Sequence, residues 1–146
     1  MPRAAVNTSV VWSALAYPDW FNGRIVDSWY AGAYDLVWSS KTIDEYRDIL
    51  LDPEYLSEFG NETEIQDFLS LVELCGIEVP EIEVDLPVIR DVHDEIWQTV
   101  AIGGHADYLV SVDNDFLQEP DLIRQMRTFG VRIVTPRVFL REIDRG

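Results

Sequence analysis

The sequence predicts an α/β protein with three layers, in which helices cover both faces of a central parallel sheet. Short apolar runs typical of buried strands alternate with longer runs that have helical spacing. A chain that alternates strands and helices in this way connects parallel strands through helical crossovers. No internal repeat, low-complexity segment or linker interrupts the pattern, so we expect residues 1–146 to form one domain.

The first half of the chain predicts two strands and several helices. The first strand covers residues 4–7, and an apolar, helix-compatible run follows it directly. The second strand is DLVWS at residues 35–39, which is enriched in valine and tryptophan. Three further helical patterns carry start or stop signals. WFNGRIVDSWYAG ends at Gly32, and KTIDEYRDILLD has Ser40 as its cap and ends before Pro53. EIQDFLSLVELC follows a cap at Asn61 or Thr63 and ends at Gly76.

The second half predicts a more regular alternation. Residues 77–88 alternate acidic and apolar side chains around two prolines, which indicates an edge strand or an extended connection. Cys75, the single cysteine, lies in an apolar helical pattern, so we expect a buried small side chain rather than a nucleophile. The remaining elements are a helix in VIRDVHDEIWQTVAIGG, a strand in ADYLVSV, a helix in DLIRQMRTFG, a strand in VRIVT and a helix in PRVFLREIDR that Pro136 opens.

The charge of the chain is strongly negative. Twenty-seven acids face eleven Lys and Arg, which gives a net charge of −16. The average field of such a surface repels nucleic acid. Two explanations stay open: a high-salt cell interior that screens the repulsion, or a basic partner protein that covers the acidic face. No membrane-spanning apolar run and no signal peptide is visible, so we expect a soluble, cytoplasmic protein without a membrane partner.

Polar side chains follow two of the predicted strands at the point where each ends. Asn7 ends the first strand, while Asp113 and Asp115 follow YLVSV. The carboxyl ends of parallel strands meet at one edge of a sheet, and binding residues gather there. This edge is therefore the predicted functional site.

Four segments then match a known family in order. Asn7-Thr8-Ser9 precedes VVWSAL, followed by DEYRDIL, by RDVHDEIWQTVAIGGHADYLV and by SVDNDFL. Together they resemble the PIN domain, the metal-dependent ribonuclease fold of VapC-like toxins from toxin–antitoxin pairs. VRIVTPRVFL is similar to the closing strand and helix of that family. The resemblance implies a ribonuclease that cuts RNA with Mg²⁺ or Mn²⁺, with an antitoxin protein and a second copy of the chain as candidate partners.

The resemblance also implies which residues act. It carries the catalytic acids onto Glu45, Asp94 and Asp113, and the metal ligands onto the set Asn7, Glu45, Asp94, Asp113 and Asp115, with Asp91 as a substitute for Asp94. Hard divalent cations prefer such oxygen ligands, and they activate water and hold phosphate oxygens. Acids crowded into one place destabilise a fold without a cation, so the cluster makes better sense as a metal site than as a stabilising feature.

One residue departs from the family pattern. Asn7 stands where the family has aspartate, and an amide carries no charge and cannot act as a base. We therefore expect weaker metal binding and slower hydrolysis than an aspartate would give. One alternative is a catalytically weakened or inactive PIN-fold protein that acts by binding a protein, and a second is an α/β module whose acids are only surface charge.

Two other residue types remain outside the predicted site. His93 is excluded, because a helix turns this neighbour of Asp94 away from it by about 100°. His105 is also left out of the site. The many aromatic residues of YPDWFNGRIVDSWYAG could stack RNA bases, but core packing or a protein–protein surface is the commoner role.

Overall fold

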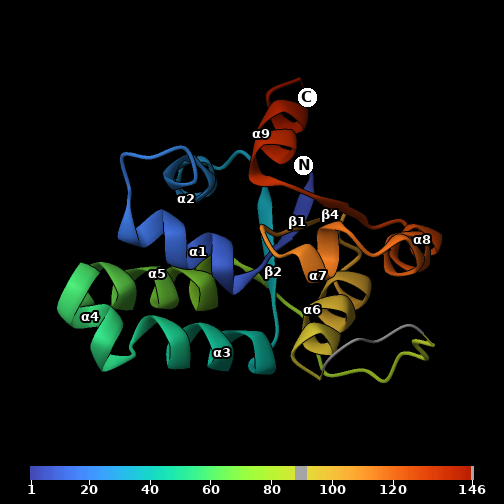
Figure 1. Ribbon diagram of the computed structural model, residues 1–146, viewed down its shortest axis with the longest axis horizontal. Coiled ribbons are helices and arrows are strands. Elements are labelled where there is room, and N and C mark those ends of the chain that lie inside the picture. Colours follow the sequence, from blue (N-terminus) through green and yellow to red (C-terminus); the bar gives the residue numbers. More distant parts are fainter. Residues whose placement is uncertain (88–91, 146) are drawn as a thin grey trace.

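The structure is a computed structural model that describes residues 1–87 and 92–145 (Figure 1). It confirms the predicted α/β class. The five strands are all parallel and pair in the order β3-β2-β1-β4-β5, which places β1 at the centre. Their bounds are β1 (Arg3–Val6), β2 (Asp35–Trp38), β3 (Ile77–Glu78), β4 (Tyr108–Val110) and β5 (Arg132–Val134).

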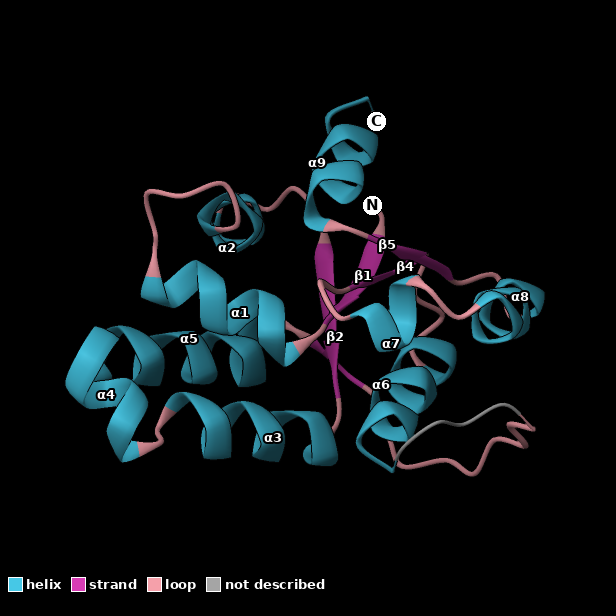
Figure 2. Ribbon diagram, viewed as in Figure 1, coloured by secondary structure: helices cyan, strands magenta, loops and turns pink. Residues whose placement is uncertain are grey.

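Helices lie on both sides of this sheet. In Figure 2, α1 to α5 lie to the left of the sheet and α6 to α8 to its right, while α9 stands above it next to α2. The described helices are α1 (Thr8–Ala16), α2 (Gly23–Tyr30), α3 (Ser40–Leu50), α4 (Pro53–Phe59), α5 (Glu62–Cys75), α6 (Val92–Gly103), α7 (Asn114–Leu117), α8 (Pro120–Thr128) and α9 (Pro136–Arg145).

The core is built around the central strands. Ala4 and Ala5 of β1 and Leu109 and Val110 of β4 have no exposed surface. Strands at the centre of a parallel sheet are covered on both faces, which explains their continuous apolar sequence. Burying a leucine or valine side chain stabilises a fold by roughly 1.5–3 kcal/mol, so these strands hold their register firmly.

The carboxyl ends of the central strands lie side by side. The Asn7 N–H donates to the carbonyl oxygen of Val110 at 2.9 Å, and the Ser111 N–H donates to that of Val134 at 3.0 Å. These bonds continue the sheet pairing one residue past β1 and β4. They bring the residue after β1 next to the loop that carries Asp113.

Two helix boundaries differ from the sequence predictions. Ser39, rather than Ser40, caps α3: it accepts a bond from the Thr42 N–H, and Thr42 accepts one in return from the Ser39 N–H. This reciprocal capping box fixes the start of the helix. Pro53 ends the α3 pattern but also begins α4, because Asp52 caps this helix and proline suits its first turn. The sequence analysis did not predict α4.

Cys75 is exposed, so the prediction of a buried side chain is wrong. The apolar face of α5 consists of Ile65, Phe68, Leu69 and Val72, and the next position facing the sheet is Gly76. A Cβ atom on Gly76 would meet the Trp38 side chain at 2.7 Å, so only glycine fits there. This close approach turns the preceding cysteine towards solvent.

Candidate active site

A pocket of about 520 Å³ lies at the carboxyl ends of β1 and β4. Four predicted site residues line it together: Asn7, Glu45, Asp94 and Asp113. They come from the end of β1, from α3, from the first turn of α6 and from the start of α7. Residues that are up to 106 positions apart in sequence thus share one hollow because of the sheet order.

Asn7 is 5% exposed and its side chain caps α1. Its Oδ1 accepts bonds from the Ser9 N–H at 3.2 Å and from the Ser9 hydroxyl at 2.8 Å. The cap requires the amide oxygen to face Ser9. Of the two polar atoms of the amide, only Nδ2 therefore takes no part in the cap. An amide nitrogen donates and does not ligate a cation, so Oδ1 could serve a metal only by weakening the cap.

Glu45 is held in place from two other elements. Its Oε2 accepts a hydrogen bond from the Thr8 hydroxyl and a second one, at 2.8 Å, from Nε1 of Trp97. These two donors fix the position of the Glu45 carboxylate between α1 and α6. The sequence analysis missed Trp97, although its position three residues after Asp94 places it on the same face of α6 and could have revealed it.

Asp113 stands at the N-cap position of α7, and its side chain makes no capping bond. Burial raises the pKa of this carboxyl above its ordinary value of 3.8, the charge of Asp115 raises it further, and a hydrogen bond with Ser9 partly offsets the rise. The Ser9 side chain therefore interacts with both Asn7 and Asp113. Asp115 does not line the pocket, but its charge acts on Asp113.

Asp94 is half-buried in the first turn of α6. Asp91, its proposed substitute, and the side chain of His93 lie outside the described residues. His105 is exposed and does not line the pocket.

The donor chemistry of the pocket fits a hard divalent cation. Three carboxylates and one amide line it, and all of them offer oxygen. Within the residues that the structure describes, however, no three His, Cys, Asp or Glu side chains are close enough together to hold a metal ion as they stand. The carboxylates are therefore gathered around one hollow but not drawn together at a single point.

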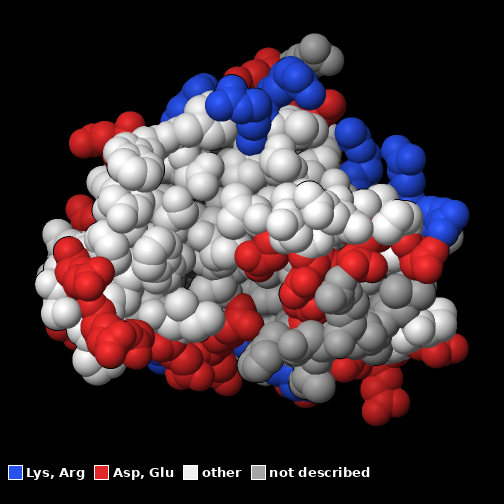
Figure 3. All heavy atoms as spheres, viewed as in Figure 1, with Lys and Arg blue, Asp and Glu red and all other residues white. Residues whose placement is uncertain are grey.

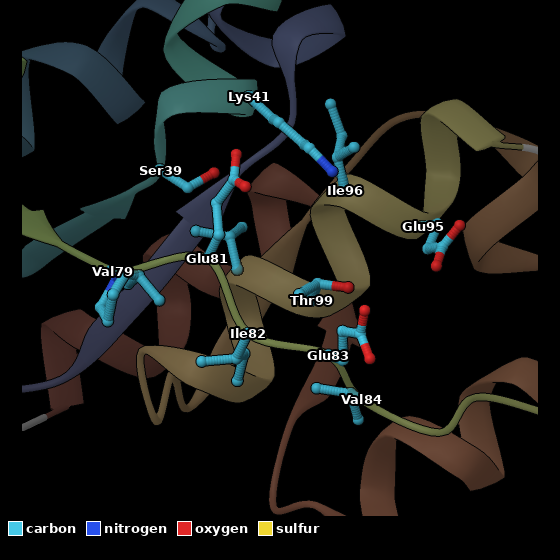
Figure 4. Close-up of a pocket in the computed structure, with 12 residues that line it drawn as sticks. Ser39, Lys41, Val79, Glu81, Ile82, Glu83, Val84, Glu95, Ile96 and Thr99 are labelled. Atoms are coloured by element: carbon cyan, nitrogen blue, oxygen red, sulfur yellow. The ribbon is translucent and has the colours of Figure 1, made fainter.

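A second hollow, of about 380 Å³, carries acids without this arrangement (Figure 4). It lies between the start of α3, residues 79–84 and α6, and its charged side chains include Lys41 and Glu81. Glu81 accepts a hydrogen bond from the Ser40 hydroxyl at 3.0 Å, so it fastens the extended segment to α3. The mixed charge of this second hollow and the structural bond of Glu81 make the hollow the weaker candidate for an active site.

Comparison with known proteins identifies the family. A family model described as PIN domain matches residues 3–115, and the chain therefore belongs to the PIN-domain family. PIN domains are a family of nucleases that often act as VapC toxins, and they typically bind a divalent metal. The match includes every predicted site residue and stops before α8, β5 and α9, so it is shorter than the resemblance predicted. No curated protein matches the chain.

Proposed function

We propose that this protein is a metal-dependent endoribonuclease and the toxin component of a toxin–antitoxin pair. One observation carries the proposal: Glu45, Asp94 and Asp113 line the pocket at the carboxyl ends of β1 and β4. Sheets of this type bind their ligands at that edge. Family membership supports a nuclease, and the excess of carboxylates supports a cation site rather than a polyanion site.

The side chains of the pocket have distinct roles in this proposal. A bound Mg²⁺ or Mn²⁺ supplies an activated water and neutralises charge on the scissile phosphate. Glu45 is held in position, because Thr8 and Trp97 both donate to its carboxylate. Asp113 has the raised pKa, so its carboxylate takes a proton more readily than an ordinary aspartate. Asp94 completes the negative charge, and Asp115 adds to it from outside the pocket.

The test is RNA cleavage with and without divalent cations. We expect the purified protein to cut single-stranded RNA with Mn²⁺ and to stop in EDTA. Asp94→Asn and Asp113→Asn should each lower the cleavage rate at least about 100-fold, which is the scale of losing a metal-site or proton-transfer group. Asp85→Asn, an exposed acid outside the pocket, is the matched control. Cleavage that survives both pocket variants would refute the proposal.

A second function has its own supporting observation. A hollow of about 470 Å³ shares Glu45 and Ile49 with the candidate site and also contains Asp44, Asp48 and Lys41. A groove with three acids and one lysine therefore extends from the pocket along α3. Such a groove suits a basic segment of a partner protein, such as an antitoxin. A protein that binds no Mn²⁺ in calorimetry, cuts no RNA and forms a stable complex with a basic partner would favour this binding role.

Self-association belongs to the proposal as well. We expect a homodimer, and light scattering of the purified protein measures its mass directly.

No helix in the described part of the chain is long and apolar enough to cross a lipid bilayer.

A further inference from the structure

The charge of the molecule is not spread evenly. Residues 124–146 contain six arginines and only two acids, although the whole chain carries −16. In Figure 3, the Lys and Arg side chains gather over α9 and α8, whereas the acids gather over α3 and α4 and below α7 and α8. The repulsion of nucleic acid that the net charge predicts therefore does not hold for every face.

Three exposed arginines form the part of this basic face nearest to α2. Arg24 of α2 and Arg137 of α9 both lie against the Phe21 ring, with their guanidinium carbons 5.3 and 4.6 Å from its centre. Arg141 follows one helical turn after Arg137 and is also exposed. Among the described residues, none of these three arginines forms an ion pair with an acid.

A continuous series of aromatic rings leads from the candidate site towards these arginines. Trp12 lines the pocket and contacts Phe59 at 5.4 Å between ring centres. Phe59 contacts Tyr17 at 5.3 Å, and Tyr17 stacks on Trp20 at 4.1 Å with an interplanar angle of 11°. Trp20 is 63% exposed and precedes Phe21 in the chain.

We propose that this aromatic–arginine track binds single-stranded RNA next to the candidate site. It is made of Trp12, Phe59, Tyr17, Trp20, Phe21, Arg24, Arg137 and Arg141. Exposed rings stack unpaired bases, and neighbouring cations hold the phosphate backbone. This surface combines both features and is continuous with the pocket. The inference rests on the proposed function for its substrate, and it adds a surface that selects unpaired RNA.

The alternative occupant is a protein surface. Much of the chain is acidic, so a second copy could place acids against the arginines. Such a contact would use the charges of the track, but it would give no reason for ring contacts to connect the exposed Trp20 to the partly buried Trp12 of the pocket. The track joins an exposed tryptophan, three arginines without an ion pair among the described residues, and the pocket. We therefore favour nucleic acid, and the test decides between the two.

The test measures binding without cleavage. Fluorescence anisotropy in EDTA reports the affinity for a short, labelled single-stranded RNA of mixed sequence and for the matching duplex. We expect tighter binding of the single strand. Trp20→Ala should weaken that binding by about 5- to 150-fold, which is the range for loss of one stacked base. Phe129→Ala, an exposed aromatic residue of the α8 end, is the matched control and should bind like the wild type.

Salt titration tests the arginines separately. For single strands, the slope of log affinity against log salt changes by about 0.7 for each phosphate contact. Arg137→Ala should therefore weaken binding and lower this slope by about that amount, whereas Arg47→Ala, which is paired with Asp44 and Glu73, should not. Asp19→Asn, which removes the acid beside Trp20, should tighten binding.

Each outcome has a defined meaning. Unchanged binding by Trp20→Ala and Arg137→Ala, or equal affinity for single strand and duplex, overturns the track. Loss of self-association in these variants with unchanged RNA binding also overturns it, because the surface would then join two copies. Binding through the track by a protein that cuts no RNA with Mn²⁺ refutes the proposed ribonuclease and supports the track.

Discussion

At the scale of single residues, Asn7 decides how strongly the pocket can hold a cation. Its Oδ1 already accepts two bonds from Ser9, so the amide serves the start of α1 before it serves the pocket. An aspartate could keep the cap with one oxygen and offer the other, with a negative charge, to the pocket. Aspartate also caps helices as well as asparagine does and suits the positive end of the helix dipole.

Asn7→Asp should therefore raise the affinity for Mn²⁺. One added charge near a cation contributes on the order of 1–4 kcal/mol in partly solvated surroundings, which corresponds to at least about fivefold in affinity. Isothermal titration calorimetry measures this change. Asn61→Asp, the same substitution at the cap of α5, is the control and should leave affinity unaltered. An Asn7→Asp protein with wild-type affinity and wild-type RNA cleavage would show that position 7 does not belong to the site.

Asp113 links the pocket to stability. Its pKa is raised in the folded protein, so the folded state binds this proton more tightly than the unfolded state does. Its favourable contribution to the free energy of unfolding is present at low pH and is lost as pH rises through the raised pKa. At pH 7 the ionised carboxyl therefore lowers the stability of the metal-free protein.

Asp113→Asn should accordingly stabilise the metal-free protein at pH 7, with a gain that shrinks as pH falls through the raised pKa. Urea unfolding in EDTA over a range of pH measures the difference, with Asp85→Asn as the charge-matched comparison. The same variant should bind Mn²⁺ more weakly, so stability and metal affinity move in opposite directions. A variant that is less stable than the wild type at pH 7 would contradict this role for the carboxyl.

At the scale of elements, α3 joins the core to the pocket. Tyr46 is fully buried, and its hydroxyl donates to the carbonyl oxygen of Val6 at the end of β1. The neighbouring Glu45 meets Thr8 of α1 and Trp97 of α6. One turn of α3 therefore fixes three elements around the candidate site.

Tyr46→Phe tests this junction. The substitution keeps the ring but removes the hydroxyl from a buried carbonyl group, which costs about 1–3 kcal/mol of unfolding free energy. Chemical denaturation measures the loss. Tyr30→Phe, in which the altered ring is half exposed, should cost much less. Equal losses for the two variants would show that the bond to Val6 contributes little.

The sequence predicted this level of organisation only in part. Short apolar strands, capped helices and the family resemblance were enough for the α/β class and for residues such as Asp113 that directly follow a strand. The spacing of Trp97 after Asp94 predicts that both lie on one face of α6. Its bond to Glu45 could not be predicted, because it joins α6 to α3 through a helix–helix contact that no local pattern encodes. The α4 helix was missed for another reason: Pro53 was interpreted only as the end of one helix and not as the start of the next.

At the scale of the whole molecule, the charge distribution separates two faces. The acids dominate the chain as a whole, while arginines concentrate in the last segment, around α8 and α9. Like charges on the acidic face repel one another in the folded state. That repulsion is relieved by a basic partner, by bound cations or by salt.

Salt should therefore stabilise the isolated protein. Raising KCl from about 0.1 M to about 1 M shortens the screening length from roughly 10 Å to roughly 3 Å, so repulsion between neighbouring exposed acids weakens. We expect a gain on the order of 1 kcal/mol, or about 3–4 °C in Tm, in a single cooperative transition, since we predict that residues 1–146 form one domain. Near pH 4.2, the isoelectric point of the sequence, the same titration should have little effect because the net charge is close to zero. A Tm that rises strongly with salt would favour adaptation to a high-salt cell interior. A Tm that KCl leaves unchanged would show that charge repulsion does not limit the stability of the fold.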